Sequence, residues 1–213
     1  MNGYFGDVAA LTRTNLRLEL RSRDTVPSLL LFVVSTLVVF RFALPADASD
    51  LAATGLLWIA VLFTALLALT RAFVAERDQR VLDGLVLSPC DRSAIWLGKA
   101  LSILAFLVVV ELIALPAFAL FFAPVDAATV AAFALADIGI VVVGTLLGAM
   151  AAASRARELL LPLLFLPLVI PVIVGGVGAS VEPDPGRYLA FLGLYDAIFA
   201  ILGWASFEYV VAE

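Results

Sequence analysis

Long unbroken runs of apolar residues dominate the pattern of hydrophobic and polar positions along this chain. The runs occupy residues 28–44, 51–70, 94–123, 127–153, 159–180 and 188–207. A helix needs roughly 20 such residues to cross a bilayer. In lipid the backbone must pair its own polar groups, so only helices or closed barrels span it, and barrel strands alternate apolar and polar residues. The pattern predicts an all-α, polytopic membrane protein with six transmembrane helices.

Composition agrees with that prediction. Of 213 residues, 64% are apolar and 15% charged, against about half and about a quarter in soluble domains. Cys90 is the single cysteine, so no intrachain disulfide can form, and the chain has no histidine. That composition excludes a histidine-based metal site, a histidine proton relay and histidine-ligated haem within this chain, and we expect no metal site.

Lysine and arginine are strongly biased to one side of the predicted membrane. Of 13 such residues, all but Arg41 and Arg187 fall before the first run, between the second and third or just inside the start of the third (Lys99), or between the fourth and fifth. Short connections rich in Lys and Arg stay in the cytoplasm. We therefore expect both termini to be cytoplasmic.

The first 26 residues precede the first apolar run and carry a stripe of charge. Arg13, Arg17 and Arg21 recur every four positions and so share one face of a helix. The segment is either a solvated charged stub or a helix lying in the membrane interface, with its arginines reaching lipid phosphates. Striped charges favour the interfacial helix over residues 1–26.

The connection over residues 71–93 is far longer than two neighbouring spans require. It mixes acidic and basic residues with a cluster of leucines, and Ser88-Pro89 ends its helical pattern. An exposed leucine cluster either docks into a groove of a partner or lies back on the membrane surface. The residues of interest are Glu76, Leu82, Asp83, Leu85, Leu87 and Pro89.

A phosphate-binding loop is absent, although Gly98-Lys99 superficially suggests one. Ser93 stands where the first glycine of that motif belongs, and Ala100 stands where serine or threonine belongs. The chain therefore has no recognisable ATP site. If ATP drives it, another subunit binds the ATP, and the chain itself is not an enzyme.

Three carboxyl groups interrupt the apolar runs. Glu111, Asp137 and Asp196 would cost several kcal/mol in lipid unless paired, protonated or facing a cavity. Such intramembrane polar residues either bind a substrate or a partner helix, or are protonated and hydrogen-bonded within the protein. Glu111 and Asp137 leave both readings open, whereas the second is favoured for Asp196.

The fifth run contains Pro162, Pro167 and Pro171, followed by Gly175-Gly176. Each internal proline removes a helix hydrogen bond and tends to kink the helix. The pattern predicts kinks or a re-entrant break. These either let the helix flex during transport or give it a fixed bend, and the fixed bend is the more common case.

Several stretches of the sequence carry a family resemblance: Gly55–Phe73, Leu85–Pro89, Gly98-Lys99, Leu163–Val174 and the C-terminal YLAFLGLYDAIF and FEYVVAE. Together, and in this order, they resemble the CcmB family, the haem exporter B permeases of a cytochrome c maturation ABC transporter. The resemblance implies a single permease domain over residues 1–213, similar to ABC-2 permeases, in a bacterial-type inner membrane. It also implies that residues 71–93 couple the permease to a cytoplasmic ATPase.

The resemblance further implies a haem-handling membrane protein and a periplasmic haem chaperone as partners. We expect contact with membrane lipid, none with nucleic acid, and a homodimer or a heterodimer with another permease. We expect no cofactor on this chain, with ATP on the partner and haem handled by the complex. Direct haem conduction and ATP-driven release of a loaded chaperone both stay open. The alternatives are an ABC-2-type exporter of a drug or glycolipid, or a transporter without an ATPase.

Overall fold

Seven α-helices make up the regular structure in the part of the chain that the computed structural model describes, which covers residues 3–22, 25–45, 49–78, 91–152 and 157–210. The helices are α1 (Tyr4–Ser22), α2 (Thr25–Ala43), α3 (Asp50–Asp78), α5 (Arg92–Phe121), α6 (Ala127–Ala152), α7 (Arg157–Val181) and α8 (Gly186–Val210). The all-α prediction is confirmed.

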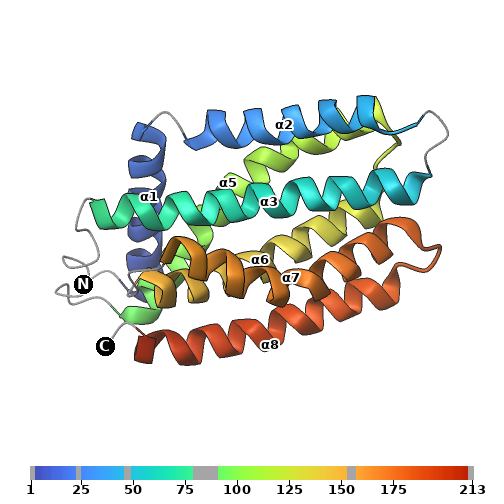
Figure 1. Ribbon diagram of the computed structural model, residues 1–213. Helices are drawn as coiled ribbons and strands as arrows, with labels where there is room; N and C mark the ends of the chain where they lie inside the picture. Colours follow the sequence, from blue (N-terminus) through green and yellow to red (C-terminus); the bar gives the residue numbers. More distant parts are fainter. Residues whose placement is uncertain (1–2, 23–24, 46–48, 79–90, 153–156, 211–213) are drawn as a thin grey trace.

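Six of these helices are long and apolar enough to cross a membrane, which confirms the six predicted spans. The candidate spans are Thr25–Ala43, Asp50–Phe73, Ser93–Phe121, Ala127–Ala151, Leu159–Val181 and Gly186–Ser206. They lie side by side, and α1 crosses one end of the bundle (Figure 1). We call the end that carries α1 the inner end and the opposite end the outer end.

The exposed sides of the bundle are apolar, as lipid requires. Leu31, Leu112 and Ile201 are each about two-thirds exposed, at 70%, 69% and 67%. Side chains of this size cover a water-soluble protein only rarely in such numbers. Lipid is the solvent that suits this surface.

Inside the bundle, Trp58 packs against one aromatic ring and against two small residues of α7. The Trp58 ring of α3 stacks on Phe133 of α6, with ring centroids 4.0 Å apart and planes 3° apart. Its Nε1 donates a hydrogen bond of 3.2 Å to Ser180 Oγ of α7. A Cβ on Gly176 would lie 2.3 Å from the Trp58 ring, so only glycine fits there. This contact holds α3, α6 and α7 together.

α1 packs along one face onto the start of α5. Val8, Asn15 and Glu19 are buried on that face, whereas Arg13 and Arg17 are exposed on another. Thr25 Oγ1 at the start of α2 donates a hydrogen bond of 2.8 Å to Glu19 Oε2. The helix predicted within residues 1–26 is thus docked on the bundle, and Arg13 and Arg17 are exposed away from that contact.

α3 extends further than the apolar pattern indicates. The sequence places the end of the second span near residue 70, yet the helix continues to Asp78. No proline precedes Pro89 in this stretch, so nothing in the backbone chemistry stops the helix at the apolar boundary. The first part of the 71–93 segment is therefore a helical extension of α3.

Candidate functional site

The inner end of the bundle brings α1, α3 and α5 together at Gly98 and Lys99. A Cβ on Gly98 would lie 2.8 Å from Leu11 Cβ and 3.3 Å from the backbone nitrogen of Thr12. Glycine is therefore what allows α1 to cross α5 at this depth. We call this contact, with that of Lys99 on α3, the inner joint.

Lys99 joins α5 to the extension of α3. Its Nζ donates a hydrogen bond of 2.8 Å to the backbone carbonyl of Ala72 and lies 5.1 Å from the centroid of the Phe73 ring. The side chain is 7% exposed. A buried ammonium group needs such partners, because an uncompensated one would be strongly destabilising. Lys99 thus fixes the start of α5 against the helix that leads into the 79–90 stretch.

The start of α5 is itself held by a helix cap and by α1. Asp91 Oδ1 accepts a hydrogen bond of 2.9 Å from Ser93 N and one of 2.8 Å from Ser93 Oγ. Ser93 Oγ also lies 3.2 Å from the Tyr4 hydroxyl of α1. An N-cap of this kind fixes where a helix begins. The chain therefore re-enters the bundle at Asp91 in a defined direction.

Most of the predicted coupling residues lie outside the described residues. These are Leu82, Asp83, Leu85, Leu87 and Pro89; Glu76 belongs to α3, but its side chain is not described. Their role in coupling stays a prediction. The described structure defines the two helix ends between which they lie.

Glu111 and Asp137 face one another between α5 and α6. Glu111 is 7% exposed and Asp137 is 1% exposed, and the two carboxyl groups lie within hydrogen-bonding reach of each other. Among the described residues, no donor outside the pair reaches Glu111 Oε1 or either carboxyl oxygen of Asp137. Two ionised carboxylates offer each other only acceptors, so the arrangement needs a hydrogen from elsewhere. We call these two residues the acid pair.

Asp196 lies on the other side of α6 from the acid pair. Its Oδ1 sits against Gly139, where a Cβ would be only 2.6 Å away. Residues 137 and 139 point in directions about 200° apart on a helix. Asp196 is buried, and none of the described residues donates a hydrogen bond to its two oxygens. The sequence favours a protonated, hydrogen-bonded Asp196, but the described residues contain no hydrogen-bond partner for it.

α7 remains one continuous helix through Pro162, Pro167 and Pro171, so the described residues contain no re-entrant break; the predicted kinks stay a prediction. Pro171 has no N–H to donate to the carbonyl of Pro167, four residues before it. The Tyr195 hydroxyl of α8 donates a hydrogen bond of 2.6 Å to the neighbouring carbonyl of Leu168. This bond ties α8 to the proline-containing part of α7.

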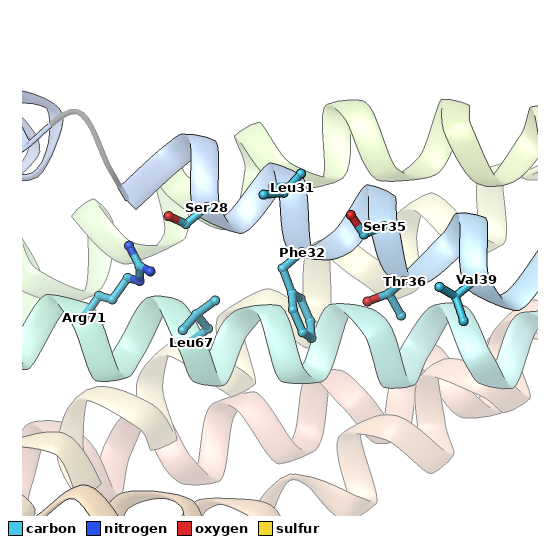
Figure 2. Close-up of a pocket in the computed structure, with 8 residues that line it drawn as sticks. All are labelled: Ser28, Leu31, Phe32, Ser35, Thr36, Val39, Leu67 and Arg71. Atoms are coloured by element: carbon cyan, nitrogen blue, oxygen red, sulfur yellow. The ribbon is translucent and has the colours of Figure 1, made fainter.

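An open groove of about 460 Å³ runs between α2 and α3, as Figure 2 shows. The hydroxyls of Ser28, Ser35 and Thr36 lie along it among apolar side chains, and Arg71 lies at its inner end. Its other lining residues are Leu31, Phe32, Val39 and Leu67. Apolar walls with a few hydroxyls can receive a lipid chain or a partner helix.

Metal binding finds no support in the described ranges. No group of three His, Cys, Asp or Glu side chains gathers there in a way that could hold a metal ion. The acid pair has only two carboxyl groups, and Asp196 faces the other side of α6.

Sequence reasoning missed the inner joint and the groove. The sequence marks Lys99 as a charge that indicates orientation, as part of an incomplete phosphate motif and as part of the family resemblance, but not as a link between two helices. The available signal was a lysine just inside the start of an apolar run, where it must find a partner. For the groove, the signal was serine or threonine at positions 28, 35 and 36 of an otherwise apolar span.

Comparison with known proteins gives consistent matches. The family model described as "CcmB protein" matches residues 7–206. "Heme exporter protein B" of Rhodobacter capsulatus is 31% identical over 210 residues, which covers 92% of this chain and 95% of that protein. "Heme exporter protein B" of Bradyrhizobium diazoefficiens is 30% identical over 184 residues, which covers 81% of this chain and 80% of that protein.

Proposed function

Because the chain belongs to the CcmB family, which consists of transporter permease subunits and not enzymes, we propose that it transmits ATP-driven motion in a haem-export complex of cytochrome c maturation. The observation that carries this proposal is the family match over residues 7–206. The family implies an ABC exporter complex with an ATPase partner, and that partner supplies the phosphate loop this chain lacks.

The proposed transmission route begins at the 71–93 segment. Its residues 79–90 would dock on the ATPase, with Leu85 at the centre of the contact. The inner joint supports this route, because Lys99 ties the α3 extension to α5 and Gly98 ties α5 to α1. A displacement of the segment would thus move three helices together.

Haem is proposed to be handled by the complex and not ligated by this chain. Histidine is the commonest protein ligand to haem iron, and the chain has none. Of its other ligand types, Cys90 lies in the proposed cytoplasmic segment, and the two methionines are Met1 and Met150. The shortage supports a role in releasing a haem-loaded periplasmic chaperone, alongside a haem-handling membrane protein.

The proposed location is the bacterial inner membrane with both termini cytoplasmic. The bias of Lys and Arg toward the inner-end connections supports this orientation. Reporter fusions after residue 90 should give a cytoplasmic signal, and those after residue 125 a periplasmic one. A periplasmic signal at residue 90 would overturn the proposal, since no ATPase could reach the segment.

Coupling is tested with Leu85→Asp and, as its matched control, Leu85→Ile. The charge should prevent docking because a buried, unpaired carboxylate is costly. We expect Leu85→Asp to insert normally but to lose ATPase co-purification and c-type cytochrome maturation, whereas Leu85→Ile keeps both. Normal co-purification and maturation with Leu85→Asp would remove the leucines from the coupling role.

Transmission is distinguished from haem conduction by the haem content of each component. The purified chain alone should carry no stoichiometric haem and hydrolyse no ATP. A deletion strain should still load the periplasmic chaperone but accumulate it unreleased. Tight haem binding by the lone chain, or an empty chaperone in the deletion strain, would favour direct conduction.

A further inference from the structure

The acid pair lies at the middle of the predicted membrane. Glu111 is ten residues before the end of α5 at Phe121, and Asp137 is ten residues after the start of α6 at Ala127. At 1.5 Å per residue, each is about 15 Å from the outer end, which is half of a hydrocarbon core of about 30 Å. The two carboxyl groups therefore meet where a charge is most costly.

No cation of the described residues reaches this depth. The helices packed against α5 and α6 are α1, α2, α3, α7 and α8. The described basic groups of these helices lie toward the ends of the bundle. They are Arg13 and Arg17 on α1, Arg41 at the outer end of α2, Arg71 near the inner end of α3, and Arg187 at the start of α8. Lys99 of α5 also lies near the inner end. The acidic groups are Asp7 and Glu19 on α1, Asp50 at the outer start of α3, and Asp196 and the Tyr195 hydroxyl on α8.

The oxygen atoms of the pair therefore need another source of compensation. Asp137 is 1% exposed, and apart from Glu111 no side chain or backbone group of the described residues donates a hydrogen bond to its oxygens. Buried polar atoms are hydrogen-bonded in the great majority of cases. A hydrogen between the two carboxyl groups would turn two mutually repelling acceptors into a donor and an acceptor.

We propose that Glu111 and Asp137 form a proton-binding site at mid-membrane, in which at least one proton is held between the two carboxyl groups. Loss of that proton would set two negative charges against each other across the α5–α6 contact. The site thus makes this contact sensitive to protonation. The proposal does not depend on haem or on the identity of the partners, so it stands or falls separately from the proposed function.

The test uses the purified full-length chain in lipid nanodiscs at neutral pH, treated with dicyclohexylcarbodiimide. A protonated carboxyl adds across one C=N bond of the reagent and its proton goes to a nitrogen, giving an O-acylisourea. The acyl group then migrates to nitrogen as a stable N-acylurea, with no leaving group. We expect mass spectrometry to find this adduct on Glu111 or Asp137.

Two variants and one change of the buffer cation complete the experiment. The double variant Glu111→Gln/Asp137→Asn should lose the adduct and an infrared band of a protonated carboxyl group, while Asp196→Asn should change the adduct yield of the acid pair by less than about twofold, since the sites are on opposite sides of α6. Replacing choline by sodium in the buffer should leave the yield unchanged.

Two results would overturn the proposal. Suppression of the adduct by sodium, by about tenfold or more, would show that the carboxylates bind a metal cation in place of a proton. Absence of the adduct together with no infrared band that the double variant removes would show that both groups are charged. The infrared measurement decides the case in which the reagent cannot enter the bundle.

Discussion

The inner joint and the acid pair both bury ionisable side chains, but they treat them in opposite ways. Lys99 is 7% exposed and has a backbone carbonyl and an aromatic ring as partners. Glu111 is equally buried at 7% exposed, yet in the described part of the chain no donor outside the pair reaches its Oε1 or either oxygen of Asp137. Burial alone therefore does not distinguish the two regions.

The difference lies in what completes each group. At the inner joint the protein supplies the compensation from its own backbone, so the charge serves to hold α5 against α3. At the acid pair the described residues outside the pair supply none, and the proposed proton between the two carboxyl groups would provide the compensation. A buried charge with partners in the protein stabilises helix packing, whereas a buried carboxyl group without such partners indicates that a ligand binds there.

The largest effect on stability should come from removing the charge of Lys99 at the inner joint. Lys99→Met keeps the apolar stem but loses the hydrogen bond to Ala72 and the contact with Phe73. We expect the free energy of unfolding to fall by about 2–3 kcal/mol, measured by titration with denaturing detergent in mixed micelles. Lys99→Arg, which keeps the charge, should be less affected. Equal stability of Lys99→Met and the unmodified chain would show that the joint contributes nothing.

A smaller effect should follow from filling the crossing of α1 and α5. Gly98→Ala places a methyl group against Leu11 and the backbone of Thr12, and we expect about 1–2 kcal/mol of destabilisation with faster proteolysis of α1. Gly193→Ala is the matched control, because a Cβ there meets nothing within 4 Å. If both variants behave alike, α1 is not held by this contact.

The outer end offers a capping carboxylate whose effect should be smaller again. Asp126 Oδ1 accepts a hydrogen bond of 2.8 Å from Thr129 N at the start of α6. Asp126→Ala should lower the free energy of unfolding by about 0.5–1 kcal/mol, as for an exposed helix cap.

This capping contribution should depend on pH. Hydrogen bonds with Thr129, from its side chain first and then from its backbone, lower the pKa of Asp126. A carboxylate favoured in the folded state contributes fully above its unfolded pKa of about 3.9 and loses that contribution as pH falls through its lower folded pKa. Asp126→Asn, which keeps an acceptor oxygen, should abolish this dependence. An unchanged acid profile in Asp126→Asn would contradict the assignment.

The smallest effect is expected at the acid pair itself. In Asp137→Asn the amide can donate a hydrogen to Glu111 in place of the held proton, so we expect a change of less than about 0.5 kcal/mol in the free energy of unfolding. Asp137→Leu, which cannot donate, should be the more harmful of the two. A severe loss with Asp137→Asn would mean that both groups act as charged acceptors for a ligand that an amide cannot replace.

Much of the architecture could be predicted from the sequence because it depends on local properties. Hydropathy over about 20 residues identifies a span wherever it lies in the fold, and all six spans were predicted. The absence of histidine and of a phosphate loop is likewise a property of the sequence alone. The sequence also identified Glu111, Asp137 and Asp196 as intramembrane carboxyl groups.

Only the tertiary structure decided which of these groups meet. All three carboxyl groups lie ten residues from the outer end of their helices, yet Glu111 faces Asp137, while Asp196 faces Gly139. The docking of α1 on α5, and the bond from Lys99 to Ala72, were equally unpredictable. A helix that is apolar on every side carries no signal of its rotation about its own axis. That rotation follows from close packing at small residues such as Gly98, Gly139 and Gly176, which depends on the neighbouring helix and not on the sequence around them.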